Sequence, residues 1–456
     1  MRRQPAASLR LDPVRPFLTA SVTLTAAFVA AGASAEGPRR LRLDECIATA
    51  QRQNQDIVTS VDEVRGAEAA RAETRGEFGP KLHADASAQR WNSPFDVPFA
   101  AAPGAPVVVF PVRDAFTWNA TVTLAQPVTS LLTILETYKI RDIGVDIAAI
   151  RREITRRDIT FRVVEGYYRL LHAERLADVA RASVEQLEGQ LRQSKSLHAN
   201  GVVSQNDVLR AELALANARQ RVLQTSSDVF LGRSRLAVLL GMSPDSAIDA
   251  EPLTSEPAPD DAMTLAQAEE RARVERVELR ELERRIGQAD HGVSVARLKL
   301  VPQVSVLGVY QHVEGSVFSQ TNAGYVGAAA SWDVWDWGTT TSGITGAEVR
   351  HHQAISARYK LDSEIRLEVR RAYTDLQQSK EARAVARAAV AQAEENYRLI
   401  TKRYEANAAT SFDVVDAEAL LTQARAQFET SLYDYLVARA ALRRATGDAQ
   451  EGAAPR

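Results

Sequence analysis

The feature that most constrains the fold of this chain is a long internal duplication. The stretch HANGVVSQNDVLRAELALANAR (198–219) recurs as YEANAATSFDVVDAEALLTQAR (404–425), at an offset of 206 residues (404 − 198). Near the start of the chain the offset is 222 (265 − 43), because LDECIATA (43–50) aligns with LAQAEERA (265–272). The difference of 16 residues (222 − 206) is explained by an insertion in the first copy at 93–111. Charged residues that are identical in the two long stretches are Asp207/Asp413, Glu212/Glu418 and Arg219/Arg425.

The duplication divides the chain into two repeats and a linker. We predict repeat 1 at 36–250 and repeat 2 at 263–447, each with a helix, a β-hairpin and a long helical hairpin. The segment 251–262 contains EPLTSEPAPDD, whose proline and acidic residues are typical of a linker. The polar tail 448–456 is predicted to be disordered.

Residues 1–35 have the order of a secretory signal peptide. Four arginines come before the apolar run FLTASVTLTAAFVAAGA (17–33), and the small residues Ala33-Ser34-Ala35 form a cleavage site. A membrane anchor is the alternative, but 17 residues rich in alanine and threonine are short for one. We expect a mature chain that starts at Glu36. No other apolar run reaches the roughly 18 residues of a spanning helix, so any membrane insertion would use strands.

Each repeat is predicted to begin with a helix of about 35 residues, which a proline ends. The predicted helices cover 43–78 and 264–300, and the strand-like runs that follow them cover 82–89, 116–124, 303–311 and 323–334. Apolar and polar residues alternate in these runs, which is typical of a strand with one polar face. Their length of about ten residues suits a tilted strand in an outer membrane, but a soluble hairpin fits the alternation equally well.

The second long helix of each repeat carries a coiled-coil seam. Small and branched residues recur with 3,4 spacing from Val208 to Leu239 and again from Val414 to Ala445. Such spacing over about five heptads predicts helices packed along their length. The helix before the first seam, about 138–199, would be roughly 90 Å long at ~1.5 Å per residue.

The quoted stretches are predicted to be the tips where these helices turn back. Gly201 and Asn407 occupy the same aligned site, and both residue types tolerate a left-handed backbone. Ser204-x-x-Asp207 and Thr410-x-x-Asp413 predict capping boxes at the start of the returning helices.

Four strands per chain predict a closed oligomer if they enter a membrane. One chain cannot close a barrel with four strands, and open sheet edges do not persist in lipid. Cyclic symmetry would close the sheet, and three chains would supply twelve strands and twelve long helices. These physical arguments predict closure and leave the number of chains open.

The chain resembles the TolC family of outer-membrane efflux and export ducts over roughly 41–447. The resemblance rests on the duplicated starts LDECIATA…GPKL and LAQAEERA…VPQV, the strand-to-helix junctions AQPV and SWDVWDWG, and the two tips. It implies a mainly α fold with transmembrane β: a trimeric α-helical barrel of coiled-coil hairpins joined to a twelve-strand outer-membrane β-barrel. The chain would then lie in the cell outer membrane with a long periplasmic extension.

The resemblance also implies partners and a function. In the family a periplasmic adaptor (membrane fusion) protein joins the homotrimer to an inner-membrane pump or ABC transporter. The expected function is therefore the exit duct of a tripartite efflux or type I secretion system, opened at its periplasmic tip. A periplasmic coiled-coil adaptor or scaffold without a pore is the alternative, but adaptors lack strand pairs embedded in a full-length duplication.

A gate at the periplasmic tip is implied by the same resemblance. In the family, rings of aspartates narrow the mouth, and a Tyr and an Arg of the second hairpin hold an Asp of the first. The pattern YEANAATSFDVVD matches these residues at Tyr404, Asp413 and Asp416, and NGVVSQND matches the first-hairpin acid at Asp207. The family's arginine falls on Ala409, so that part of the latch is absent.

Helix capping is a structural explanation for two of these acids. A carboxylate at the position of Asp207 or Asp413 caps backbone N–H groups and meets the helix dipole favourably. Asp416 aligns with Arg210 of repeat 1, so the hairpin does not require an acid there, and Asp416 is the favoured gate residue. We hypothesise that Arg210 supplies the missing cation and pairs with Asp413 or Asp416. Tyr404 fits packing along its helix equally well.

The sequence favours no enzyme, cofactor or metal site. The net charge of −2 gives no reason to expect nucleic acid, and the lone Cys46 excludes an internal disulfide and a cysteine-built metal site. The seven histidines are scattered, and no G-x-S-x-G, P-loop or G-x-G-x-x-G motif is present. We interpret WDVWDWG (332–338) as a strand that leaves the bilayer through an aromatic girdle, with ring packing as the alternative.

Overall fold

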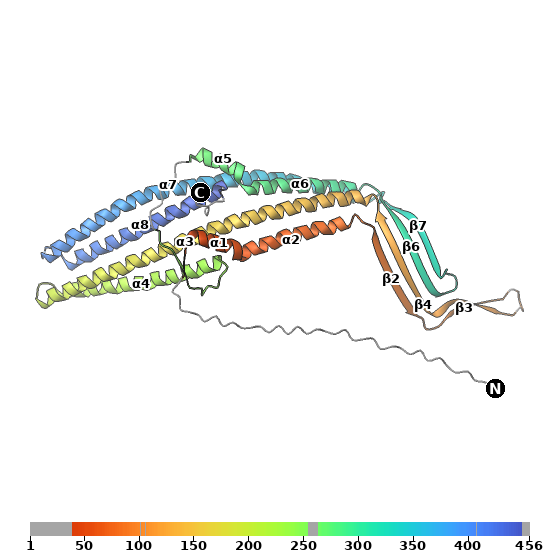
Figure 1. Ribbon diagram of the computed structural model, residues 1–456, viewed down its shortest axis with the longest axis horizontal. Coiled ribbons are helices and arrows are strands. Elements are labelled where there is room, and N and C mark those ends of the chain that lie inside the picture. The colour runs from red at the N-terminus through yellow and green to blue at the C-terminus, as the bar shows by residue number, and fades with distance from the viewer. Residues whose placement is uncertain (1–38, 101, 105, 254–262, 407, 449–456) are drawn as a thin grey trace, which may run out of the picture.

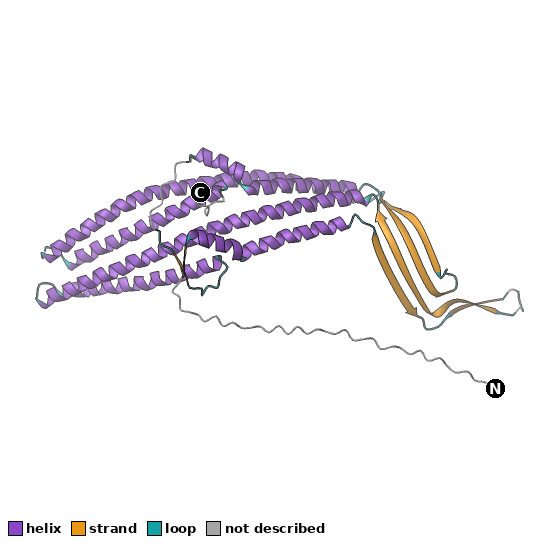
Figure 2. Ribbon diagram, viewed as in Figure 1, coloured by secondary structure: helices purple, strands orange, loops and turns teal. Residues whose placement is uncertain are grey.

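The chain is elongated, with helices over most of its length and an antiparallel sheet at one end (Figures 1 and 2). The computed structural model describes residues 39–100, 102–104, 106–253, 263–406 and 408–448. The predicted signal peptide, most of the predicted linker and the tail beyond Asp448 lie outside the described residues. Two helical hairpins lie side by side, and their tips are at the end farthest from the sheet (Figure 1).

The helices follow the same order in both repeats. Repeat 1 contains α1 (Leu43–Gln53), α2 (Gln55–Gly76), α3 (Ser130–Ala199) and α4 (Gln205–Leu239); repeat 2 contains α5 (Leu265–Glu275), α6 (Val277–Leu298), α7 (Thr339–Glu405) and α8 (Ser411–Thr446). Helices α1 and α5 both have 11 residues, and α2 and α6 both have 22. With 70 residues, α3 is about 105 Å long at ~1.5 Å per residue. Within the described ranges, none of the helices has the length and apolar character needed to cross a membrane.

The prediction of one continuous helix at the start of each repeat, over 43–78 and 264–300, is wrong. The helix is interrupted at Asn54 in repeat 1 and at Arg276 in repeat 2, where the backbone is extended. Neither residue is a glycine or proline, so the local sequence carries no signal for the interruption.

The interruption is explained by the end of the returning helix. Gly241, with φ +77°, follows α4, and a Cβ at this position would collide with the backbone carbonyl of Gln53. Gly447, with φ +87°, follows α8, and a Cβ there would lie 2.9 Å from the Cβ of Glu275. The first helix of each repeat therefore turns where a glycine of the same repeat packs against it.

The sheet joins the two repeats. Its strands are β2 (Lys81–Arg90), β3 (Phe95–Phe99), β4 (Val108–Pro127), β6 (Gln303–Ser316) and β7 (Asn322–Ser331). They run antiparallel in the order β2-β4-β6-β7, and β3 also pairs with β4. The unpredicted strand β3 and the extension of β4 come from the insertion at 93–111. A separate two-stranded parallel sheet pairs β1 (Arg39–Leu41) with β5 (Ile248–Ala250).

The register of the sheet gives it one apolar and one polar face. Leu82 pairs with Leu124, and Val122 pairs with Ala84 on one side and Tyr310 on the other. The opposite face carries His83, Asp85, Thr121, Thr123 and Gln311. Within the chain, β2 pairs only with β4 and β7 pairs only with β6, so each has one unpaired edge among the described residues.

The interpretation of WDVWDWG as a strand is wrong. Strand β7 ends at Ser331, and residues 332–338 form the loop that leads into α7. Asp336 caps this helix, because the backbone N–H of Thr340 donates to its Oδ2 at 2.7 Å. The three tryptophans are exposed, and the rings of Trp335 and Trp337 pack edge to face.

The main core lies midway along the helices and repeats the duplication. Ile159, Val163 and Leu170 of α3 are buried there, and their equivalents 206 residues later in α7 are also buried. The equivalents are Ile365, Val369 and Leu376. The seam positions of α4 and α8 are buried or half-buried, as the 3,4 spacing predicts.

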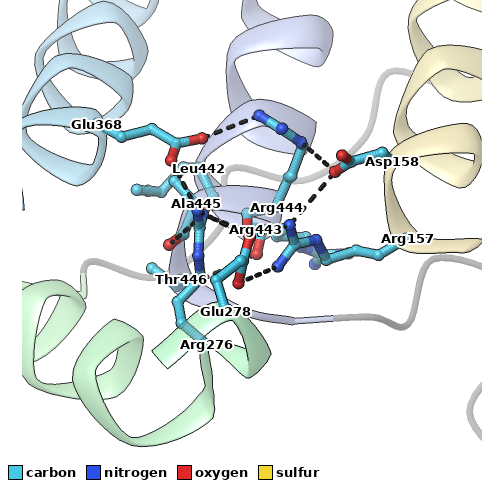
Figure 3. A network of polar contacts seen from close by, with 10 residues as sticks. All are labelled: Arg157, Asp158, Arg276, Glu278, Glu368, Leu442, Arg443, Arg444, Ala445 and Thr446. Carbon is cyan, nitrogen blue, oxygen red and sulfur yellow. Dashed lines mark hydrogen bonds and ion pairs between the residues drawn. The ribbon is translucent and has the colours of Figure 1, made fainter. Parts of the chain in front are cut away.

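A charged network borders this core and joins α3, α6, α7 and α8 (Figure 3). Its members are Arg157, Asp158, Arg276, Glu278, Glu368 and Arg444. Arg276 donates to Glu368 at 2.9 Å and to the backbone carbonyl of Ala445 at 3.3 Å. Three arginines and three carboxylates balance in charge, and Arg276 also caps the last turn of α8.

Candidate gate at the helical tips

The first tip has the geometry that its sequence predicts. Gly201 has φ +73°, in the left-handed region. Ser204 and Asp207 form a capping box, in which the Ser204 N–H donates to Asp207 Oδ2 at 3.1 Å and the Asp207 N–H donates to Ser204 Oγ at 3.4 Å. Asp207 therefore stabilises the start of α4.

The second tip repeats the capping box of the first. The Thr410 N–H donates to Asp413 Oδ2 at 2.7 Å, and the Thr410 hydroxyl donates to the same oxygen at 2.8 Å. These two bonds lower the pKa of Asp413. Asn407, the predicted turn residue of this tip, lies outside the described residues.

Tyr404 connects the two hairpins. Its side chain is 1% exposed, and its hydroxyl lies 3.1 Å from the hydroxyl of Ser194 in α3. Ser194 is itself fully buried. Tyr404 therefore both packs in the interior and ties the second hairpin to the first, and its partner is a serine, whereas the family pattern has an aspartate.

Further hydrogen bonds join the hairpins along their length. These bonds are Ser183 Oγ to Glu418 Oε1 at 2.6 Å, Ser411 Oγ to the Asp207 carbonyl at 3.3 Å, and His172 Nε2 with Thr430 Oγ1 at 3.1 Å. Each one connects the first hairpin with α8. Movement of the second hairpin away from the first would break them together with the Tyr404 contact.

Arg210 and Asp416 do not contact each other within the chain. The Arg210 guanidinium lies over the ring of Phe412, with its Cζ 5.2 Å from the ring centroid. Asp416 is exposed on α8, and within the described residues it makes no hydrogen bond or ion pair. The hypothesised pairing of Arg210 with Asp413 or Asp416 stays a prediction, and Phe412 is the contact that the structure gives to Arg210.

The cross-hairpin role of Glu418 was missed by the sequence analysis, although a signal was present. Its equivalent Glu212 pairs with Lys195 of its own hairpin at 2.9 Å. The residue equivalent to Lys195 in repeat 2 is Thr401, so Glu418 lacks this cation. Glu418 is 4% exposed, and a buried carboxylate requires a partner, which Ser183 provides.

The duplicated arginines have a structural role. Arg219 pairs with Glu188 at 2.8 Å in the first hairpin, and Arg425 pairs with Glu394 at 2.9 Å in the second. The same ion pair therefore joins the two helices of each hairpin at equivalent positions.

No cluster of histidine, cysteine, aspartate and glutamate in the described ranges could hold a metal ion. Burial and the neighbouring carboxylates of Glu45 and Asp44 raise the pKa of the Cys46 thiol to about 12, which keeps it from acting as a nucleophile.

Long helical hairpins are joined to a two-faced sheet, and acidic residues lie at the tips of the hairpins. The Outer membrane efflux protein family matches residues 46–242 and 269–448, and the chain belongs to this family. The resemblance to the TolC family is thereby confirmed. The family consists of transport conduits, so the chain is an outer-membrane efflux protein and not an adaptor without a pore.

Solved structures of membrane proteins share the fold. VceC of Vibrio cholerae matches with a TM-score of 0.73 and 18% identity, over 89% of this chain and 96% of its own. CmeC of Campylobacter jejuni matches with a TM-score of 0.76 and 15% identity, over 91% of this chain and 87% of its own. A membrane protein from Pseudomonas aeruginosa has a TM-score of 0.76 and 16% identity, over 90% and 91% of the two chains. No curated protein matches the sequence.

Proposed function

We propose that three copies of this chain close into a channel-tunnel. The unpaired edges of β2 and β7 would pair between neighbouring chains, giving twelve long strands with the apolar face toward lipid. The long helices would continue as a periplasmic tunnel. The observation that carries the proposal is that one chain has a two-faced sheet with two free edges and helices of 70 and 67 residues.

The tunnel would serve as the exit duct of a tripartite efflux or type I secretion system. A periplasmic adaptor and an inner-membrane pump or ABC transporter would engage the tips, which lie at the end of the chain opposite the sheet. The proposed organisation keeps a signal peptide at 1–35, repeats at 36–250 and 263–447, a linker at 251–262 and a tail at 448–456.

The gate of this duct is proposed at the tip of the second hairpin. Asp413 and Asp416 are three residues apart on one helix face, so a trimer would place six carboxylates around the mouth. Asp416 is the better gate residue because the capping of α8 already occupies Asp413. Tyr404 would hold the second hairpin closed, and Gly201 and Asn407 would shape the tips.

Single-channel conductance in a planar bilayer tests both the duct and the gate. We expect a small, cation-preferring pore for the wild type and a wider or less selective pore for Asp416→Ala. Unchanged conductance and selectivity in the variant would show that Asp416 is not the gate residue. Detergent-purified protein that forms no pore at all would contradict the duct.

Arg210 is tested in the same bilayers. An exposed ion pair contributes about 0–1 kcal/mol, so loss of three such pairs in Arg210→Ala should raise conductance only moderately. Arg210→Lys, which keeps the charge, is the control. Equal conductance of the wild type and Arg210→Ala would refute the hypothesis.

A further inference from the structure

A basic hollow lies between α1, α2 and α3 of repeat 1, midway between the tips and the sheet. It has a volume of about 630 Å³, and none of the residues that line it is acidic. The lining includes Arg52, Arg152, Arg156, Gln51, Ala48 and Val61. We call this surface the basic hollow.

Within the residues that the structure describes, the three arginines of the basic hollow have no carboxylate partner. Arg156 Nη2 donates to Gln51 Oε1 at 2.7 Å, and Arg52 Nε donates to the carbonyl of Ala48 at 3.1 Å. Across the described part of the chain, no ion pair involves Arg52, Arg152 or Arg156. All three side chains are exposed, so their charge is available at the surface.

Repeat 2 provides an internal comparison, because α5 and α6 have the same lengths as α1 and α2, and buried core positions of α3 recur in α7. At the equivalent surface Arg358 Nη2 donates to Glu283 Oε1 at 3.2 Å. Arg273 lies 3.9 Å from Asp362. Each arginine of this surface therefore has an acid beside it.

The acids of repeat 2 are replaced in repeat 1. Val61 stands where repeat 2 has Glu283 (283 − 222), and Arg156 stands where it has Asp362 (362 − 206). Ala48 likewise replaces Glu270 (270 − 222). Because the fold forms in repeat 2 with paired charges, it does not require three unpaired arginines in repeat 1. The three arginines therefore indicate an acidic partner outside the chain.

We propose that the basic hollow binds an acidic peptide segment of a protein partner. Guanidinium groups match carboxylates with planar, two-pronged hydrogen bonding, and three of them would take up several acidic side chains. Ala48 and Val61 offer apolar surface that a small inorganic anion would leave unused, whereas aliphatic side chains of a peptide would cover it. The basic hollow is separate from the tips, so this interaction would be distinct from gating.

Binding is tested with full-length protein in detergent and a peptide of alternating glutamate and leucine that carries an uncharged dye. We expect fluorescence anisotropy to show binding that weakens as salt rises, since the contacts are exposed ion pairs. The same peptide with glutamine in place of glutamate should not bind. Failure of the wild type to bind the acidic peptide would overturn the proposal.

The variant Val61→Glu/Arg156→Asp is the matched loss-of-binding test. It introduces acids where repeat 2 has Glu283 and Asp362, an arrangement that the fold already accepts. We expect affinity for the acidic peptide to fall about tenfold or more, with an unchanged thermal unfolding curve. Equal affinity of this variant and the wild type would overturn the proposal.

The reverse exchange in repeat 2 is the gain-of-binding test. Glu270→Ala/Glu283→Val/Asp362→Arg would make a second basic hollow, so the number of peptides bound per chain should rise from one to about two. Inorganic pyrophosphate serves as the competing probe. If pyrophosphate bound the wild type as tightly as the peptide and displaced it, the site would be a general anion site and the peptide proposal would be wrong.

Discussion

Replacing Arg276 by alanine should lower the free energy of unfolding by about 3 kcal/mol. The side chain of Arg276 is 5% exposed and lies 3.1 Å from Glu278 and 2.9 Å from Glu368. It also donates to the carbonyl of Ala445 at the end of α8. Alanine would leave two carboxylates without this guanidinium and a helix end without its cap.

The magnitude follows from the burial of the partners. Removing one member of a buried ion pair costs about 3–5 kcal/mol, because the remaining charge is left uncompensated. The side chain of Glu278 is 15% exposed, whereas that of Glu368 is 34% exposed and partly screened by water. Arg157 and Arg444 keep a cation beside each of these acids. The lower end of the range is therefore expected.

The assay is chemical unfolding of detergent-purified protein followed by far-UV circular dichroism. Arg276→Asn is the matched control, because Asn54 occupies the equivalent site of repeat 1 and donates to the Leu239 carbonyl at 2.9 Å. The asparagine would keep the helix cap and lose only the charge. We expect its stability to lie between those of the wild type and Arg276→Ala.

A second substitution tests whether the charge itself matters. In repeat 1 the position of Glu368 holds Arg162, which lies 3.9 Å from Asp56. Arg276→Asn/Glu368→Arg would copy that arrangement and should recover part of the stability lost in Arg276→Asn. Equal unfolding midpoints for the wild type and Arg276→Ala would refute the stabilising role of the network.

Three other predictions concern side chains in the interior of the helices. Tyr404→Phe removes the contact with the Ser194 hydroxyl and should cost about 1 kcal/mol, whereas Tyr404→Ala also removes the packed ring and should cost several times more. Equal losses would assign the whole effect of Tyr404 to its hydroxyl and would contradict the packing role of the ring. Burial and hydrogen bonding to Asp249 raise the pKa of Glu174 from 4.5 to about 7. The protonated carboxyl of Glu174 therefore contributes to the free energy of unfolding below pH 4.5, and this contribution is lost as the pH rises through 7. Glu174→Gln should make the stability less dependent on pH and stabilise the protein above pH 7 by up to about 3 kcal/mol. The check is the unfolding midpoint of the wild type and of the variant, measured across this pH range. Parallel pH profiles of the two proteins would contradict the prediction. Burial raises the pKa of Cys46 to about 12, so a thiol reagent should label it at neutral pH only after unfolding, and rapid labelling of the native protein would show that its site opens.

The parts of the fold that sequence analysis predicted are those specified locally. The 3,4 seams, the capping boxes at Asp207 and Asp413, and the alternating strands all depend on residues within a few turns of each other. The helix interruption at Asn54 depends on Gly241, which is 187 residues away (241 − 54), and no local signal marks it. Strand β3 was missed because the insertion has no counterpart in repeat 2.

Comparison of the two repeats distinguishes residues that the shared fold requires from residues that differ between them. Arg219 and Arg425 are identical because the same ion pair closes each hairpin. The cross-hairpin contact of Glu418 depends instead on a difference between the repeats. Lys195 pairs with Glu212 in repeat 1, whereas repeat 2 has Thr401 at the position of this lysine. Comparison of the two repeats would have identified Glu418 from sequence as an acid without its usual partner, but not that Ser183 would be the replacement.

This difference predicts the effect of Thr401→Lys. The new lysine would stand where Lys195 stands in repeat 1, and it should draw the Glu418 carboxylate away from Ser183. The link between the hairpins would weaken by about 1 kcal/mol per chain, and the channel should open more readily in a planar bilayer. Thr401→Met, which adds similar length without charge, is the control. Equal conductance of the two variants would mean that the Glu418 contact contributes nothing to closure.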